Sequence, residues 1–316
     1  MREAHTKHTC VILAAGAGSR IAALKAERPK SLLPIANKPL IGHQLEMLAG
    51  LGVSRVILVS NSTTLETTAR ELASPSIELI FIEQKAAEGI SHSLAFLEDR
   101  LDEPFMALLG DTFIHAPTLA PALSAFAASP AEAFVFIRAH STPEEISAGF
   151  AVVADAFGRV LRVVEKPTRR ISDTRGCGVY LFRPSIFDAI RKTARSPLRN
   201  EYELTDAIQT LIDSGALALV ASPGKWDMNI NTPEDLLLCN LLLADTAGKS
   251  IISASAQIHP GAVISRSVIG PGASILNPIQ IRNSLVAENV CLDSSGPIEN
   301  TLIFPSGIYV CPPDTI

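Results

Sequence analysis

Short apolar runs alternate with helical patterns from Cys10 to about Val220. This alternation is typical of strand–helix–strand units, which build a mostly parallel sheet covered by helices. We therefore expect an α/β domain with a mostly parallel, mixed sheet. The expected strands are residues 10–14, 55–60, 77–82, 105–109 and 133–138, and the helices between them are residues 41–51, 64–73, 92–100 and 119–127.

A second group of strands is expected at residues 150–153, 160–164 and 178–182, where the pattern indicates a meander. Two amphipathic helices should follow at residues 204–214 and 233–247. Thr232 and Pro233 are suited to open the second of these helices. The first domain is expected to span residues 1–249.

Beyond Lys249, apolar residues recur at intervals of about five or six, with small and turn-forming residues between them. This period predicts a hexapeptide-type parallel β-helix over residues 250–316, in which each coil stacks on the next. Residues 292–304 interrupt the repeat, and a small antiparallel β domain is the alternative. The expected apolar positions are Ile252, Ile258, Val263, Ile269, Ile275, Ile281, Leu285 and Val290.

The composition excludes several classes of protein. The net charge of −5 argues against a nucleic-acid surface, which needs a concentrated excess of Lys and Arg. The apolar run at residues 11–15 is too short for a signal or membrane segment, so we expect a cytoplasmic protein. No Cys or His spacing suits zinc. Buried free thiols are expected at Cys10, Cys177, Cys239, Cys291 and Cys311.

A glycine-rich turn, residues 13–20, follows the first strand. Its backbone amides can point at phosphate oxygens, because the turn lies at the carboxyl end of a strand. A Rossmann dinucleotide site is the rival interpretation, but its fingerprint needs a small residue where this chain has Ile21. Arg20 and Lys30, at the two ends of the following loop, can neutralise a triphosphate.

These residues, with the runs 29–35 and 38–41, resemble the signature of the sugar-1-phosphate nucleotidyltransferases, the glucose-1-phosphate thymidylyltransferase type among them. The resemblance extends from about Thr9 to Leu243. It implies a Rossmann-like catalytic domain of the nucleotide-diphospho-sugar transferase type, followed by a short left-handed parallel β-helix. It also implies a reaction, dependent on Mg²⁺, in which a sugar 1-phosphate and a nucleoside triphosphate give an NDP-sugar and pyrophosphate.

The resemblance assigns the nucleotide to the end of the first strand and to the segment 83–93. Without the other motifs, Gln84 would be interpreted as part of an exposed loop before a helix. With them, it resembles the segment that recognises the edge of the base. The residues implied in nucleotide binding are Leu13, Ala14, Gly16, Gly18, Gln84 and Gly89.

The Gly110-Asp111 pair resembles the strand-end motif whose aspartate holds Mg²⁺ against the α-phosphate. A carboxylate at the mouth of an apolar strand is a suitable hard oxygen ligand. The segment 226–235 resembles the motif that supplies the second metal ligand. Alignment on its Thr-Pro-Glu-Asp end puts Asn229 where many relatives have aspartate, and Asp227 is the alternative ligand.

The Glu165-Lys166-Pro167 run is similar to the motif in which glutamate binds sugar hydroxyls and lysine binds the sugar phosphate. Gly149 and Tyr180 lie in segments that, by the same resemblance, pack their backbone against the sugar. A sugar-phosphate oxygen would attack the α-phosphorus in line. Arg20, Lys30, Asp111 and Lys166 form the expected catalytic set, acting by positioning and charge neutralisation.

The base and the sugar stay open. The spacing of the residues in segments 89–93 and 204–208 most resembles that of long-form thymidylyltransferases. This resemblance favours dTTP or UTP as the nucleotide and glucose 1-phosphate as the sugar phosphate. Mannose-1-phosphate guanylyltransferase is an alternative, as is a non-catalytic regulatory or scaffold paralogue. The C-terminal segment is short for an acyltransferase, so we expect it to support a homo-oligomer.

Overall fold

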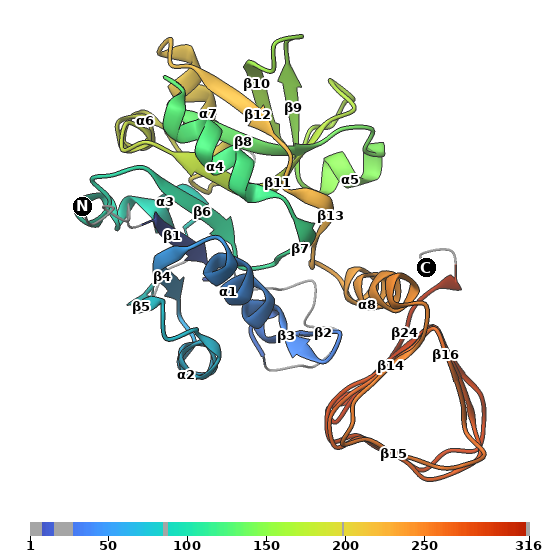
Figure 1. Ribbon diagram of the computed structural model, residues 1–316. Helices are drawn as coiled ribbons and strands as arrows, with labels where there is room; N and C mark the ends of the chain where they lie inside the picture. Colours follow the sequence, from blue (N-terminus) through green and yellow to red (C-terminus); the bar gives the residue numbers. More distant parts are fainter. Residues whose placement is uncertain (1–7, 16–27, 85–87, 198, 314–316) are drawn as a thin grey trace. The chain divides into compact units, whose positions relative to one another are not determined.

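The computed structural model describes residues 8–15, 28–84, 88–197 and 199–313 (Figure 1). The chain forms two compact units. The α/β unit comprises Met1–Gly16 and Gln44–Asp227, and the β-helix unit comprises Ala17–His43 and Met228–Ile316. The last border between the two units therefore follows Asp227, whereas residue 249 was expected.

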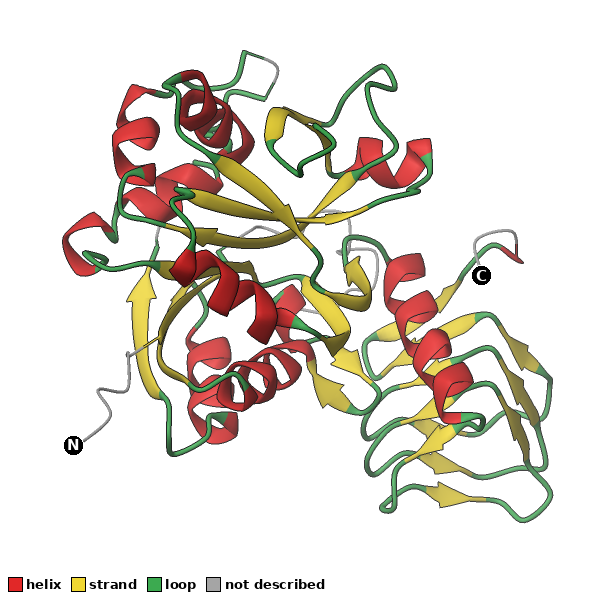
Figure 2. Ribbon diagram, turned by 45° about the horizontal axis from the view of Figure 1, so that its top comes forward, coloured by secondary structure: helices red, strands yellow, loops and turns green. Residues whose placement is uncertain are grey.

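Helix α8 (Pro233–Ala247) explains the difference, because it belongs to the β-helix unit. Asp245 near its end accepts hydrogen bonds from Arg266, and Glu234 in its first turn accepts one from Tyr309. The helix begins with a capping box at Thr232 and ends at Gly248, which adopts the left-handed conformation with φ 65°. Figure 2 shows α8 lying along the coils of the β-helix.

A nine-stranded mixed sheet forms the centre of the α/β unit, with a main strand order of β10-β9-β11-β6-β1-β4-β5. The strands β6, β1, β4 and β5 are parallel, whereas β11 is antiparallel to β6. Strand β8 pairs with β11 and with β12. The bounds are β1 His8–Leu13, β4 Val53–Ser60, β5 Glu78–Glu83, β6 Phe105–Leu109, β8 Ala133–Arg138, β9 Phe150–Ala154, β10 Val160–Glu165, β11 Arg175–Phe182 and β12 Ala218–Ala221.

The mostly parallel mixed sheet is confirmed, but the expected meander is wrong in its order. Strand β9 lies between β10 and β11, so β10 is at the edge of the sheet. The physical reason is that β11 is long enough to pair with β6, β8 and β9 at different points along its length.

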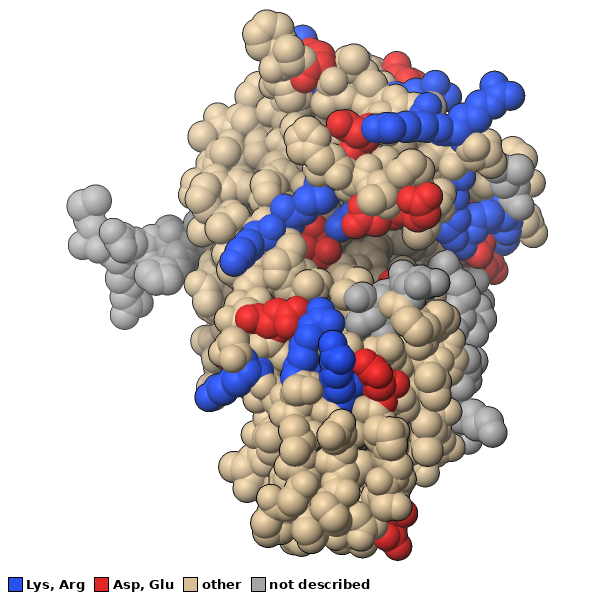
Figure 3. All heavy atoms as spheres, turned by 90° about the vertical axis from the view of Figure 1, so that its right-hand side faces the viewer, with Lys and Arg blue, Asp and Glu red and all other residues tan. Residues whose placement is uncertain are grey.

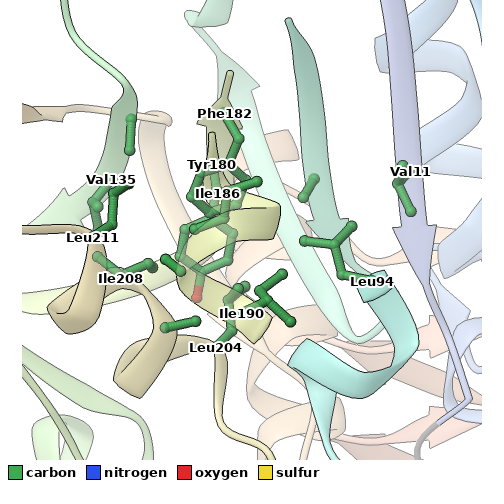
Figure 4. Close-up of a cluster of buried hydrophobic side chains, with 14 of the residues drawn as sticks. Val11, Leu94, Val135, Tyr180, Phe182, Ile186, Ile190, Leu204, Ile208 and Leu211 are labelled. Atoms are coloured by element: carbon green, nitrogen blue, oxygen red, sulfur yellow. The ribbon is translucent and has the colours of Figure 1, made fainter. Parts of the chain in front are cut away.

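Helices cover both faces of this sheet. On one face, α3 (Ile90–Ala95), α6 (Ile186–Lys192) and α7 (Leu204–Asp213) pack against the strands in one apolar cluster (Figure 4). Tyr180 and Phe182 of β11 lie at its centre. On the other face, Phe126 of α4 (Leu119–Ala128) contacts the ring of Phe134 in β8. The remaining helices of the unit are α1 (Leu40–Gly50), α2 (Thr63–Leu72) and α5 (Pro143–Ala148).

Two further strands, β7 (Thr112–Pro117) and β13 (Gly224–Asn229), form a small separate sheet. His115 stacks on Trp226, with ring centroids 5.1 Å apart. Thr118 N donates to Pro223 O at 3.0 Å. The end of β7 therefore lies beside the start of β13, so the two strands run antiparallel.

The coils of the β-helix unit form three sheets, one on each side of a triangular cross-section (Figure 1). The strands of successive coils are parallel, and β24, the last strand of one sheet, is antiparallel to its neighbour β23. Successive coils pair at a spacing of 17 residues, as in Ile251↔Val268 and Val268↔Leu285. Ser267 and Ser284 repeat at the same spacing, and each Oγ accepts from a backbone amide of the next coil. The bounds are β2 Pro34–Ile35, β3 Lys38–Pro39, β14 Ile251–Ile252, β15 Gln257–Ile258, β16 Val263–Ser265, β17 Val268–Ile269, β18 Ser274–Ile275, β19 Gln280–Arg282, β20 Leu285–Val286, β21 Cys291–Leu292, β22 Ile298–Glu299, β23 Thr301–Phe304 and β24 Gly307–Val310.

The expected parallel coils are present, but three details of this unit were wrong. Cys291 in β21 is exposed, whereas a buried thiol was expected. Residues 292–304 continue the coils, because Leu302 pairs with Leu285 in register. Val263 is exposed, since its neighbour Ile264 occupies the column that pairs with Ile281. A slip of one residue reverses which side chain faces inward.

Candidate active site

The parallel strands β6, β1, β4 and β5 end at one edge of the sheet, where several predicted residues lie. Ala14 follows β1, and its N–H donates to Val59 O at 2.8 Å. Gln84 follows β5, and its N–H donates to Ser60 O at 3.1 Å. Gln84 is buried, unlike the exposed loop residue that it would be in isolation. Gly16, Gly18 and Arg20 lie outside the described residues.

The Gly110-Asp111 turn lies at the same edge, directly after β6. Gly110 N donates to Leu13 O at 2.9 Å, which ties the turn to the end of β1. Gln44 in α1 donates through Nε2 to Leu109 O at 2.9 Å and to Thr112 O at 2.8 Å. The turn is therefore held from both sides. Gln44 was not among the predicted site residues, although a polar residue among the apolar positions of that helix was a signal.

Gly178 brings β11 close to this turn. Its φ is 70°, and a Cβ atom there would lie 2.6 Å from Thr112 Oγ1. Only glycine fits such a left-handed residue in close contact with its neighbour. Two residues further on, the Tyr180 side chain is buried in the apolar core, and burial raises the pKa of its hydroxyl well above the usual value. The Tyr180 side chain thus faces the core, which leaves the backbone of this strand for the predicted sugar contact.

Gly89 allows a second close contact between two backbone segments, here with Tyr202. The φ of Gly89 is 114°, and a Cβ atom there would lie 2.4 Å from Tyr202 O. Backbone hydrogen bonds join the two segments, from Tyr202 N to Glu88 O at 2.8 Å and from Ser91 N to Tyr202 O at 3.0 Å. The segment after β5 is therefore attached to the residues that precede α7.

Glu165 and Lys166 lie at the end of β10. Lys166 N donates to Gly149 O at 2.8 Å, so these two predicted residues are adjacent. Lys166 has a φ of 38°, a conformation that a lysine rarely adopts. Such a backbone marks a position whose geometry is imposed by its surroundings.

The Glu165 carboxylate belongs to a charged cluster. It accepts a hydrogen bond from Thr205 Oγ1 at 3.3 Å, and Arg199 Nη1 lies 3.4 Å away. Arg199 also donates to Glu203 at 2.8 Å. Burial, with the nearby Glu203 charge, raises the pKa of Glu165 to about 7, although Lys166 and Arg199 oppose the shift. Glu165 can therefore change its charge near neutral pH.

Asp227 is held by two arginines. Arg138 donates through Nε and Nη2 to one carboxylate oxygen, at 3.0 and 2.9 Å, and Arg175 donates to the other at 2.6 Å. The Asp227 side chain is fully buried. Both of its oxygen atoms thus have guanidinium partners, which would compete with a metal ion. Neither Arg138 nor Arg175 was among the residues predicted from the sequence.

The β-helix unit brings together the predicted residues that it contains. Lys30 Nζ donates to Asn231 Oδ1 at 2.7 Å. Asn231 lies two residues after Asn229, the last residue of β13. The Asp235 carboxylate accepts from the N–H groups of Asn231 and Thr232, which fixes this segment at the start of α8. Lys30 and the Asn229–Asn231 segment are therefore neighbours.

The described residues form neither a ready-made metal cluster nor, on the face shown in Figure 3, a single charged surface. Within the described ranges, no group of three or more His, Cys, Asp or Glu residues could hold a metal ion. On the face drawn in Figure 3, Lys and Arg side chains lie among Asp and Glu side chains rather than in one basic field. None of the described helices combines the length and the apolar character that a membrane crossing requires.

Known proteins are similar to this chain in sequence and in fold. Glucose-1-phosphate thymidylyltransferase from Streptomyces griseus is 29% identical over 303 residues, which cover 90% of this chain and 84% of the relative. UTP–glucose-1-phosphate uridylyltransferase from Haloferax volcanii is 30% identical over 226 residues, covering 71% of this chain and 92% of the relative. A probable mannose-1-phosphate guanylyltransferase from Arabidopsis thaliana is 27% identical over 344 residues, covering 95% and 92%.

A solved structure of UDP-glucose pyrophosphorylase complexed with UDP-glucose has the same fold. Its TM-score is 0.65 at 22% identity, and the match covers 76% of this chain and 99% of that structure. The family model described as nucleotidyl transferase matches residues 9–244, about the span of the resemblance found in the sequence. The chain therefore belongs to the nucleotidyl transferase family.

Proposed function

We propose that this protein is a sugar-1-phosphate nucleotidyltransferase that joins glucose 1-phosphate to dTTP or UTP and releases pyrophosphate. One observation carries the proposal. The predicted residues of the α/β unit come from well-separated segments, yet Ala14, Gln84 and the Gly110-Asp111 turn lie along one edge of the sheet. Family membership and the substrates in the relatives' names support the same reaction.

Asp111 and Asn229 are the residues proposed to hold Mg²⁺. Asp111 follows β6 in the α/β unit, and Asn229 is the last residue of β13. The engagement of Asp227 by Arg138 and Arg175 favours Asn229 over Asp227. One carboxylate and one amide oxygen fit Mg²⁺, which takes few protein ligands and completes its shell with phosphates and water. Bound there, Mg²⁺ would neutralise phosphate charge as a Lewis acid.

The remaining residues would position and neutralise the reactants. Lys166 would orient the sugar phosphate, whose oxygen attacks the α-phosphorus while the bond to pyrophosphate breaks. Arg20 and Lys30 would stabilise the charge on the departing pyrophosphate. No general base is required, because the attacking phosphate is already ionised at neutral pH. Leu13, Ala14, Gly16, Gly18, Gln84 and Gly89 would hold the nucleotide.

The role of the C-terminal coils is a further part of the proposal. We assign catalysis to residues 1–249 and assembly of a homo-oligomer to residues 250–316. Stacked coils leave an exposed terminal surface, and Ile252 in the first coil is exposed. Light scattering of the purified chain tests this assignment. The cytoplasm is the proposed location, because the reaction uses nucleoside triphosphates.

The reaction is tested by a matrix of dTTP, UTP, GTP, CTP and ATP against glucose 1-phosphate and mannose 1-phosphate, measured by pyrophosphate release. We expect the highest kcat/KM with glucose 1-phosphate and dTTP or UTP. Highest activity with GTP and mannose 1-phosphate would support the guanylyltransferase alternative instead. Absence of pyrophosphate release in every combination would favour the non-catalytic paralogue.

The pKa of Glu165 predicts how substrate binding depends on pH. Ionised Glu165 accepts hydrogen bonds from sugar hydroxyls, and the group gains its charge as pH rises through about 7. The KM for glucose 1-phosphate should therefore be up to roughly tenfold higher at pH 6 than at pH 8. Glu165→Gln is the matched control, because its side chain does not titrate and any remaining pH dependence comes from the substrate or from other groups of the cluster, such as Glu203, whose pKa burial also raises. Equal profiles for the two proteins would contradict the assignment.

A further inference from the structure

Building on the proposed function, we infer that Gln44 is a positioning residue that holds Asp111 in place for the metal-dependent step. Gln44 lies in α1 and is buried, with 3% of its surface exposed. Its side-chain nitrogen uses both of its hydrogens on the carbonyls of Leu109 and Thr112, the residues that bracket the turn. Neither contact involves the Asp111 side chain, so Gln44 acts through the backbone of the turn.

The chemistry of these contacts fixes the orientation of the amide. Both neighbours are carbonyl oxygens, so the nitrogen must face them and Oε1 must point away. Among the described residues, Gln44 Oε1 is buried and has no hydrogen-bond partner. An apolar side chain of similar length would have no such unsatisfied acceptor. We therefore attribute the presence of glutamine here to the way it holds the turn, and not to a gain in packing.

A third hydrogen bond holds the turn, and it differs from the two that Gln44 makes. The bond from Gly110 N to Leu13 O at 2.9 Å attaches the turn to β1 but leaves the Leu109 and Thr112 carbonyls to other donors. Gln44 fixes these two carbonyls from the neighbouring helix. A residue that orients a metal ligand in this way commonly changes metal affinity or activity by 10- to 100-fold when it is replaced.

The test compares Gln44→Met with Arg183→Met. Arg183 is a matched control, because it also fixes a turn through backbone carbonyls, Ala131 O at 2.9 Å and Ser129 O at 2.8 Å, with a third bond to Phe126 O at 3.4 Å. This turn contains no site residue. We expect Gln44→Met to lower kcat by about 10- to 100-fold, with an unchanged KM for the sugar phosphate. Arg183→Met should lower thermal stability and keep the wild-type kcat.

A binding measurement separates this inference from the proposed function. Electron paramagnetic resonance measures Mn²⁺ binding in the presence of nucleoside triphosphate and without sugar phosphate, so that no turnover is needed. Gln44→Met should bind Mn²⁺ more weakly than the wild type and Arg183→Met. Wild-type kcat and Mn²⁺ affinity in Gln44→Met would overturn the inference. An inactive wild type would instead count against the proposed function, and the Mn²⁺ comparison would still test Gln44.

A second variant covers the case in which Gln44→Met does not fold. Gln44→Asn keeps the amide but is shorter by one methylene, so it cannot reach both carbonyls from the same helix position. We expect intermediate losses of kcat and of Mn²⁺ affinity. Wild-type values for this variant would likewise contradict a positioning role.

Discussion

Asp111→Asn should lower the rate of pyrophosphate release by roughly 1,000-fold while leaving the fold intact, since a bound metal contributes several kcal/mol of charge stabilisation. The substitution keeps the size of the side chain and removes its negative charge. The backbone contacts of the turn, from Gly110 N to Leu13 O and from Gln44 to Leu109 O, do not involve the Asp111 side chain. Stability and activity should therefore separate in this variant.

Two measurements check this result. Steady-state pyrophosphate release gives kcat and kcat/KM over a range of Mg²⁺ concentrations, and thermal unfolding shows whether the variant is folded. Asp213→Asn is a suitable control, because it removes the same charge from an exposed position at the end of α7. Near-normal turnover in Asp111→Asn would refute the assignment of Asp111 to the metal.

Much of the α/β fold could be predicted because its signals are local. Strand β6 is continuously apolar, and such a run is typical of a central parallel strand. The bounds of β6 and β8 agree with the expected ranges, and so do those of α8, where Thr232 and Pro233 mark the first turn. The glycine positions of the motifs also have local causes, such as the positive φ of Gly89 and Gly178.

The parts that could not be predicted depend on contacts between distant residues. Gln44 is 65 residues from Leu109, and Arg138 is 89 residues from Asp227. Nothing in the local sequence pairs them, because the pairing is a product of the sheet order. The register of the β-helix was missed for a related reason, since Val263 and Ile264 are both apolar and only the neighbouring coil selects between them.

The Asp227 cluster matters for stability as well as for β13. Arg138 also donates to Gly224 O and Lys225 O, and Arg175 donates to Asp227 O. The two arginines therefore attach β13 to β8 and β11. Burial lowers the pKa of Arg175, but the charge and hydrogen bond of Asp227, together with Cys177 and Glu145, outweigh it, so the net pKa is raised and the guanidinium stays charged. The cluster thus contains charged groups that depend on one another inside the unit.

Arg175→Met should destabilise the protein by about 3–5 kcal/mol, because it leaves a buried carboxylate with one of its two partners. For a domain of this size, such a loss lowers the Tm by about 10 °C or more in thermal unfolding. Arg70→Met is the control. Arg70 pairs with Glu66 on the surface of α2, where ion pairs contribute little, so its Tm should stay close to that of the wild type.

The double variant Arg175→Met/Asp227→Asn distinguishes the charge from simple loss of packing. If the under-compensated charge is the main cost, Asp227→Asn should recover part of the lost Tm, because the buried negative charge that lacked Arg175 is then absent. Strictly additive losses from the two substitutions would show instead that each side chain stabilises the unit by packing alone. Since β13 continues from Asp227 to Asn229, we also expect Arg175→Met to lower kcat at temperatures where the variant is still folded.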